Sequence, residues 1–302
     1  MILAVAEAGA HLSWDLGADL RQMFAYHFMV NAFRAGTIAA VAAGAIGWFM
    51  VLRRQTFAGH TLALVGFPGA SAATWLGIAT VWGYFGFCIG AAVAIAALPR
   101  SDHGGGFSEE SAVIGTIQAF ALASGLLFVS LYHGFLNGID ALLFGSFLGV
   151  TDRQVLILAL VAVVALGLLV VIGRPLLFAT VDRDVAAARG LPTRVLSVVF
   201  LLLLALAVAE VSQITGSLLV FAVLVMPAAA AQQLTARPGA GIAASIGIAV
   251  LATWAGLVAA YFSPYPVGFY VTTFAFAAYL AATLRRSAGQ RPSRGRVRVA
   301  AA

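Results

Sequence analysis

Two ionisable side chains of this 302-residue sequence lie at the edges of long apolar stretches, His60 at the start of one and Glu210 at the end of another. An imidazole nitrogen and a carboxylate oxygen are both donors to divalent metal ions, so we expect His60 and Glu210 to be transient metal ligands. Two alternatives are open. His60 could cap its helix or bond a backbone carbonyl, and Glu210 could be a solvated charge at a helix end.

Two further residues, Gln118 and Pro227, lie inside apolar stretches. Gln118 either lines a pathway through the protein or bonds a neighbouring helix. Pro227 opens the segment PAAAA, where we expect a kinked helix whose small residues let another helix approach closely. Both residues are therefore candidates for a pathway.

Several kinds of chemistry are excluded by the residue types. All 17 basic residues are arginines, so the chain has no lysine for a GxxxxGK[ST] phosphate-binding loop or a Schiff base. It lacks HExxH and GxSxG motifs, and Cys88 is its single cysteine. We expect no catalytic residue, no bound cofactor and an inert, buried Cys88 in this chain.

The composition predicts the elements that must position these residues. Hydrophobic residues make up 62% of the chain, charged residues 9%, and the mean hydropathy is +1.02. This is typical of a polytopic membrane protein, and stretches near 20 residues predict an all-α bundle. We place nine spans near residues 35–52, 60–77, 79–98, 112–131, 154–173, 193–211, 216–233, 240–261 and 267–284. They form one domain, 35–286, between an N-terminal segment, 1–34, with an interfacial helix, and a basic, disordered tail, 287–302.

The arginines predict the orientation of these spans. If Arg53 and Arg54 are cytoplasmic, 14 of the 17 arginines fall on the cytoplasmic side, and the opposite orientation inverts that ratio. Cytoplasmic connections carry the excess of positive charge in membrane proteins. We therefore expect an external N-terminus and a cytoplasmic C-terminus.

One connection, 182–190, has the signals of a short cytoplasmic helix. Asp182 and Asp184 stand at its start, Arg189 at its end, and Gly190 is a helix terminator. Because the chain has no nucleotide site, such a helix could be the place where a separate, energy-supplying protein acts on it. The alternative is an ordinary interfacial helix.

Two motifs resemble a known family. LRRQTFAG at 52–59 and GSLLVFAVLVMPAAAA at 216–231 are similar, in order and spacing, to the permease subunit of the zinc/manganese-type ABC importers. The resemblance extends over about residues 28–285. It implies a fold related to the vitamin B12 and siderophore importers in the bacterial cytoplasmic membrane.

The resemblance also implies partners. Such permeases pair as homodimers, dock a separate ATP-binding subunit that hydrolyses ATP, and receive metal from an extracellular metal-binding protein. The family's coupling helix matches residues 182–190 here. The chain itself would then be a transporter subunit and not an enzyme.

The sequence departs from the family where a metal site is expected. The family shows Gly-Asp-x-Leu-x-His at the start of the second span, whereas this chain has Gly59, His60, Leu62 and Leu64. His60 in place of a carboxylate favours zinc over manganese as the transported metal. Two other functions stay open: an ABC permease for a cobalamin or siderophore cargo, and a secondary metal transporter that needs no motor.

Overall fold

The chain folds into a bundle of helices, as expected for a sequence with so few charges. The computed structural model describes residues 21–97, 106–132, 149–217, 220–263 and 265–289, and no strand occurs within these ranges. The helices follow in the order α3 (His27–Leu52), α4 (Thr56–Leu76), α5 (Thr80–Ala97), α6 (Gly106–Leu131), α8 (Asp152–Val181), α9 (Arg183–Ala188), α10 (Thr193–Thr215), α11 (Val220–Leu234), α12 (Pro238–Tyr261) and α13 (Val267–Gly289). The predicted all-α membrane bundle is confirmed.

Each predicted span corresponds to one helix, but not every one of these helices is both long and apolar enough to cross a membrane. Seven of the described helices are long and apolar enough to do so, namely α3, α5, α6, α8, α10, α12 and α13. α11 is short, with 15 residues, and α4 is long enough but too polar to meet the same criterion. The count of nine spans is therefore approximate.

The helix ends differ from the predicted span ends because hydropathy marks only the apolar centre of a helix. α8 was predicted over 154–173, but it begins with a capping box between Thr151 and Gln154 and continues through Pro175 to Val181. α3 begins at His27 and not at residue 35. Most of the predicted N-terminal segment and of the basic tail lies outside the described residues.

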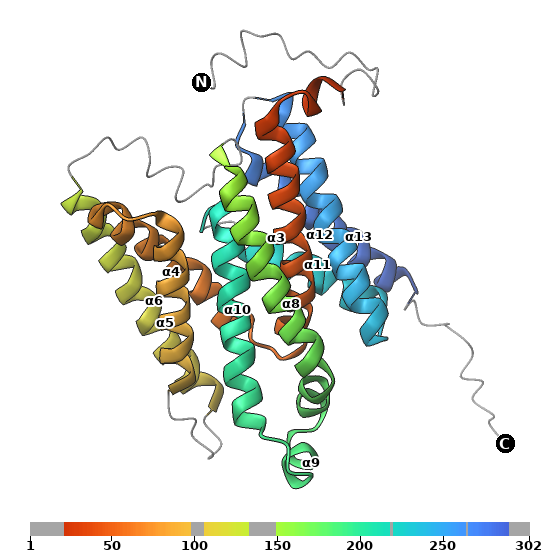
Figure 1. Ribbon diagram of the computed structural model, residues 1–302. Coiled ribbons are helices and arrows are strands. Elements are labelled where there is room, and N and C mark those ends of the chain that lie inside the picture. Colours follow the sequence, from red (N-terminus) through yellow and green to blue (C-terminus); the bar gives the residue numbers. More distant parts are fainter. Residues whose placement is uncertain (1–20, 98–105, 133–148, 218–219, 264, 290–302) are drawn as a thin grey trace, which may run out of the picture.

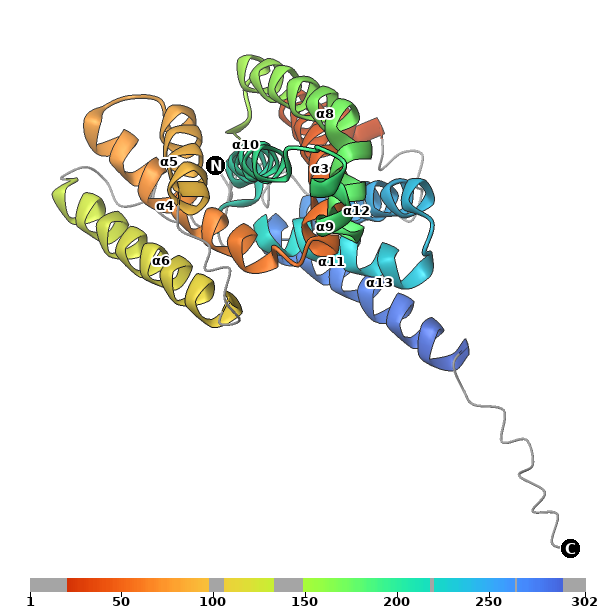
Figure 2. The same cartoon turned by 90° about the horizontal axis from the view of Figure 1, so that it is seen from below.

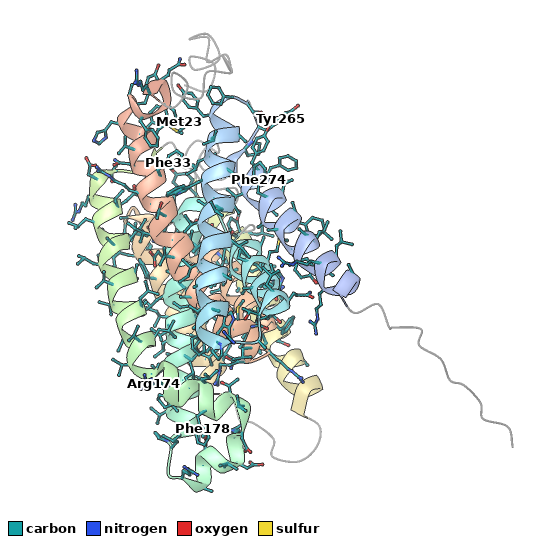
Figure 3. All side chains as sticks on the ribbon, turned by 90° about the vertical axis from the view of Figure 1, so that its right-hand side faces the viewer. Met23, Phe33, Arg174, Phe178, Tyr265 and Phe274 are labelled. Carbon is teal, nitrogen blue, oxygen red and sulfur yellow. The ribbon has the colours of Figure 1, made fainter. Side chains whose placement is uncertain are left out.

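α10 occupies the middle of the bundle. Figures 1 and 2 show α4, α5 and α6 on one side of it and α3, α8, α11, α12 and α13 on the other. α10 packs against α3, α4, α5 and α8. α9 projects from one end of the molecule, here termed the α9 end (Figure 1). Arg174 and Phe178 of α8 lie toward this end, far from Met23 and Tyr265 at the opposite end (Figure 3).

The interior is built largely from small residues. Alanines and glycines occupy much of the buried face of α3, and the Ser245 hydroxyl of α12 donates a 2.7 Å hydrogen bond to the Gly44 carbonyl of α3. In a membrane, small residues of this kind let helix backbones approach closely and gain dispersion contacts. Polar side chains placed in such a tightly packed interior have few neighbours able to bond them.

Candidate functional site

His60 lies in the first turns of α4 and faces the beginning of α11. Its ring meets the Phe221 ring edge to face, with centroids 4.9 Å apart and planes at 67°. Its Nδ1 is buried without a hydrogen-bond partner. The helix N-cap is Gln55, and no side chain caps α4. Among the described residues the His60 side chain therefore does not cap α4 and its Nδ1 donates to no carbonyl, and its role as a metal ligand stays a prediction.

The residues that follow His60 are held by two other helices. The Thr61 hydroxyl donates to the Gln118 Oε1 of α6 at 3.2 Å, and the Cys88 thiol of α5 donates to the Leu62 carbonyl at 3.5 Å. Of the two interpretations of Gln118, the structure thus favours the bond to a neighbouring helix. Cys88 is fully buried, as predicted. These contacts fix the direction in which α4 presents His60.

Glu210 is fully buried in α10, with 0% of its surface exposed. Neither carboxylate oxygen has a hydrogen-bond partner. The alternative that Glu210 is a solvated charge is wrong, because the helix continues to Thr215 and neighbouring helices cover this face of α10. An unpaired carboxylate in an apolar interior is costly unless a proton or a metal cation compensates its charge. Glu210 is therefore a candidate ligand for a cation inside the bundle.

α4, which carries His60, contacts α10, which carries Glu210. Gly66 of α4 packs against Ser212 of α10, since a Cβ at residue 66 would stand 3.3 Å from the Ser212 Oγ. Both helices begin toward the α9 end, and His60 precedes this contact by six residues and Glu210 by two.

These candidate ligands do not form one dense metal site. Among the described residues, no group of three or more histidine, cysteine, aspartate or glutamate side chains is arranged to hold a metal ion. Sparse ligands bind a cation weakly, and weak binding lets an ion leave as readily as it enters.

Pro227 lies buried in α11, which continues as one helix through it. The alanines after it, Ala228, Ala230 and Ala231, are fully buried. Three residues before Pro227, α11 touches α3, where Gly47 meets the Leu224 backbone. The kink and the close approach of another helix to PAAAA itself stay predictions.

α9 confirms the short helix predicted between residues 182 and 190. The Asp182 carboxylate caps it by accepting a 2.9 Å hydrogen bond from the Val185 amide, and Asp184 lies in its first turn. Arg189 is the C-cap, and Gly190 follows with a φ of +78° that favours glycine. The helix is mostly exposed, with only Ala186 buried. Its charged side chains are therefore exposed at the α9 end of the molecule.

Sequence reasoning missed the contacts of Phe221 and the burial of Glu210. Phe221 carries no chemical signal of its own, and its role beside His60 depends on how α11 crosses α4. The apolar helices long enough to cross a membrane and the fully buried carboxylate of Glu210 are typical of one class of protein, polytopic membrane transport proteins.

Comparison with known proteins gives the family. The model of the ABC 3 transport family matches residues 25–286, and the chain belongs to this family. It is 28% identical over 244 residues to the manganese transport system membrane protein MntC of Halalkalibacterium halodurans, covering 80% of each chain. It is 28% identical over 263 residues to the chelated iron transport system membrane protein YfeC of Yersinia pestis, covering 87% of this chain and 88% of YfeC.

A solved structure agrees with the fold. PsaBC from Streptococcus pneumoniae, determined in complex with Fab, matches with a TM-score of 0.77 and 25% identity, over 87% of this chain and 93% of that chain. The resemblance read from LRRQTFAG and GSLLVFAVLVMPAAAA is thus confirmed at the level of the family.

Proposed function

We propose that this chain is the membrane-spanning permease subunit of an ATP-driven importer for a divalent transition metal. The observation that carries the proposal is the fully buried, unpaired carboxylate of Glu210 inside a bundle of the ABC 3 transport family. The relatives named above as manganese and chelated iron transport proteins support a metal cargo.

The chain cannot supply the energy for transport, because it has no lysine for a P-loop. We assign ATP hydrolysis to a separate ATP-binding subunit that docks on α9 through Asp182, Asp184, Arg189 and Gly190. An extracellular metal-binding protein would deliver the ion to the other face, and two copies of the permease would enclose the pathway. Movement of α9 by the ATP-binding subunit would then open the pathway alternately to the outside and the inside of the membrane.

We propose an orientation in which α9 and the C-terminus are cytoplasmic and the N-terminus is external, in the bacterial cytoplasmic membrane. The arginine distribution supports it, since 14 of 17 arginines then lie inside. A cysteine introduced at residue 185 of α9 should resist a membrane-impermeant thiol reagent in intact cells. Labelling of that cysteine from outside would contradict this orientation.

The choice between metals depends on the ligand types. An imidazole at residue 60 favours zinc, whereas a carboxylate favours manganese. We therefore propose that zinc competes with manganese for uptake and does so at the lower concentration. Competition between the two radioactive metals measures this preference, and stronger competition by manganese contradicts it.

The proposed function is tested by reconstitution. The chain is placed in lipid vesicles with its ATP-binding subunit and metal-binding protein, and entry of radioactive zinc or manganese is followed with and without ATP. We expect uptake only when ATP and the ATP-binding subunit are present. Equal uptake without that subunit would indicate a secondary transporter, and uptake of a cobalamin or ferric siderophore instead of free metal would indicate an organic cargo.

His60→Ala should lower metal uptake by about tenfold, because it removes one imidazole ligand, whose loss costs on the order of 1.4 kcal/mol in the barrier to passage. Co-purification with the ATP-binding subunit should be unchanged, since His60 lies inside α4 and not on α9. Thr56→Ala, at the half-buried start of the same helix, is the control and should transport normally. Undiminished uptake by His60→Ala at all metal concentrations would leave the residue with a structural role only.

A further inference from the structure

Arg53, which follows the last residue of α3, reaches two other helices with one guanidinium group. Its Nη1 donates to the Thr180 hydroxyl of α8 at 3.0 Å, and its Nη2 donates to the Ser197 hydroxyl of α10 at 2.9 Å. Its Cζ also lies 5.3 Å from the centre of the Phe200 ring. The three contacts come from residues far apart in the sequence, so Arg53 joins α3, α8 and α10 at the α9 end.

The two hydroxyl groups stand on either side of α9. Thr180 lies two residues before Asp182, the N-cap of α9, and Ser197 lies in the first turns of α10, directly after the connection from Arg189. One side chain therefore bonds both legs of the hairpin that carries α9. Any displacement of α9 relative to the bundle must be transmitted through these legs, or it must break the bonds to Arg53.

The hydroxyl groups are oriented for this role. Thr180 donates its proton to the Leu176 carbonyl at 2.6 Å, and Ser197 donates its proton to the Thr193 carbonyl at 2.9 Å. Each oxygen therefore presents its lone pairs to the guanidinium, which donates to both at once. A lysine ammonium lacks the planar fork that spans two separated acceptors.

Arg53 also contacts the start of the helix that carries His60. Its Nε donates to the Gln55 Oε1 at 3.3 Å, and Gln55 is the N-cap of α4. Between them Arg54 has a φ of 57°, which makes the turn from α3 to α4 short. His60 follows Gln55 by five residues, or about 7.5 Å of helix.

We propose that Arg53 is a positioning residue that ties both legs of α9 to the start of α4, so that motion of α9 reorients the segment that presents His60. This inference rests on the proposed function, because it assigns Arg53 a place in the coupling of ATP hydrolysis to transport. The tie is short and made of charge-assisted hydrogen bonds, which are stronger and more directional than bonds between neutral groups.

The test compares two adjacent arginines in the full transport complex. Arg54 is exposed and its side chain makes no hydrogen bond or ion pair with the described residues, so Arg54→Gln is a matched control for loss of one charge. We expect Arg53→Gln to lower metal uptake per ATP hydrolysed at least tenfold, while the ATP-binding subunit still binds and hydrolyses ATP. Arg54→Gln should stay within about twofold of the wild type.

Three further variants separate a tie from a general structural role. Removing both acceptors with Thr180→Val and Ser197→Ala should reproduce the loss, and adding Arg53→Gln should then cause no further loss. Arg53→Lys, which keeps the charge and folding, should restore only part of the coupling. Additive losses, or full coupling in Arg53→Gln, would overturn the proposal.

A measurement that does not depend on transport tests the role of Arg53 separately from the proposed function. Cys88 is fully buried, so a spin label attached at Val185→Cys, on an exposed residue of α9, reports α9 alone. We expect the label to become more mobile in Arg53→Gln and unchanged in Arg54→Gln. Unchanged mobility in both refutes the tie, whereas absence of ATP-dependent uptake by the wild type refutes the proposed function.

Discussion

Glu210→Met should lower metal uptake about 100-fold without reducing the thermal stability of the permease. The carboxylate is fully buried and neither oxygen is hydrogen bonded, so it contributes no hydrogen bond that the variant could lose. Replacing an unpaired buried charge by an apolar side chain of similar size is neutral or stabilising. Its attraction for a passing cation is lost, however, at a cost of about 2.7 kcal/mol in the barrier to passage. Uptake in vesicles and thermal unfolding in detergent measure the two effects separately.

A control for Glu210→Met lies two residues further along the same helix. Ser212 is also buried and its hydroxyl has no partner, but it carries no charge. Ser212→Ala should therefore transport normally and be as stable as the wild type. Glu210→Asp, which keeps the carboxylate on a shorter side chain, should retain part of the uptake. Normal uptake by Glu210→Met would remove Glu210 from the pathway.

The fold was largely accessible from the sequence, because composition and the length of apolar stretches dictate membrane helices. α9 was also predictable, since its caps are local: Asp182, Arg189 and Gly190 act on the backbone within a few residues of themselves. Such features depend only on neighbours in the chain. The helix ends were less accessible, because polar residues extend α8 and α3 beyond their apolar centres.

The candidate site was less accessible, because it depends on contacts between distant helices. Glu210 reads in the sequence as a residue near the end of a span, and only the packing around α10 shows that it is buried. Arg53 reads as a marker of orientation beside Arg54, and nothing in the pair distinguishes them. The structure does so, because only Arg53 bonds Thr180 and Ser197 across the α9 hairpin.

The glycines of α5 show the same limit and give the second large effect. Gly83, Gly86 and Gly90 follow one another along the helix and look alike in the sequence. Only Gly83 lies against another backbone: a Cβ there would collide with the Gly69 carbonyl of α4, while none of the atoms around Gly86 and Gly90 is within 4 Å of such a Cβ. The contact between α4 and α5 therefore depends on one glycine of the three.

Gly83→Val should destabilise the permease by at least about 3 kcal/mol and leave little folded protein, because a backbone carbonyl cannot move aside as a flexible side chain can. Since α4 carries His60 and packs against α10, forcing α4 and α5 apart would also disturb the candidate pathway. Gly86→Val is the matched control, with the same chemical change one turn along the same helix, and it should express and unfold like the wild type. Yield of monodisperse protein and thermal unfolding in detergent compare the two variants. Equal stability of both would show that α4 and α5 can separate without cost, and the close helix approach inferred from the glycine contact would then be wrong.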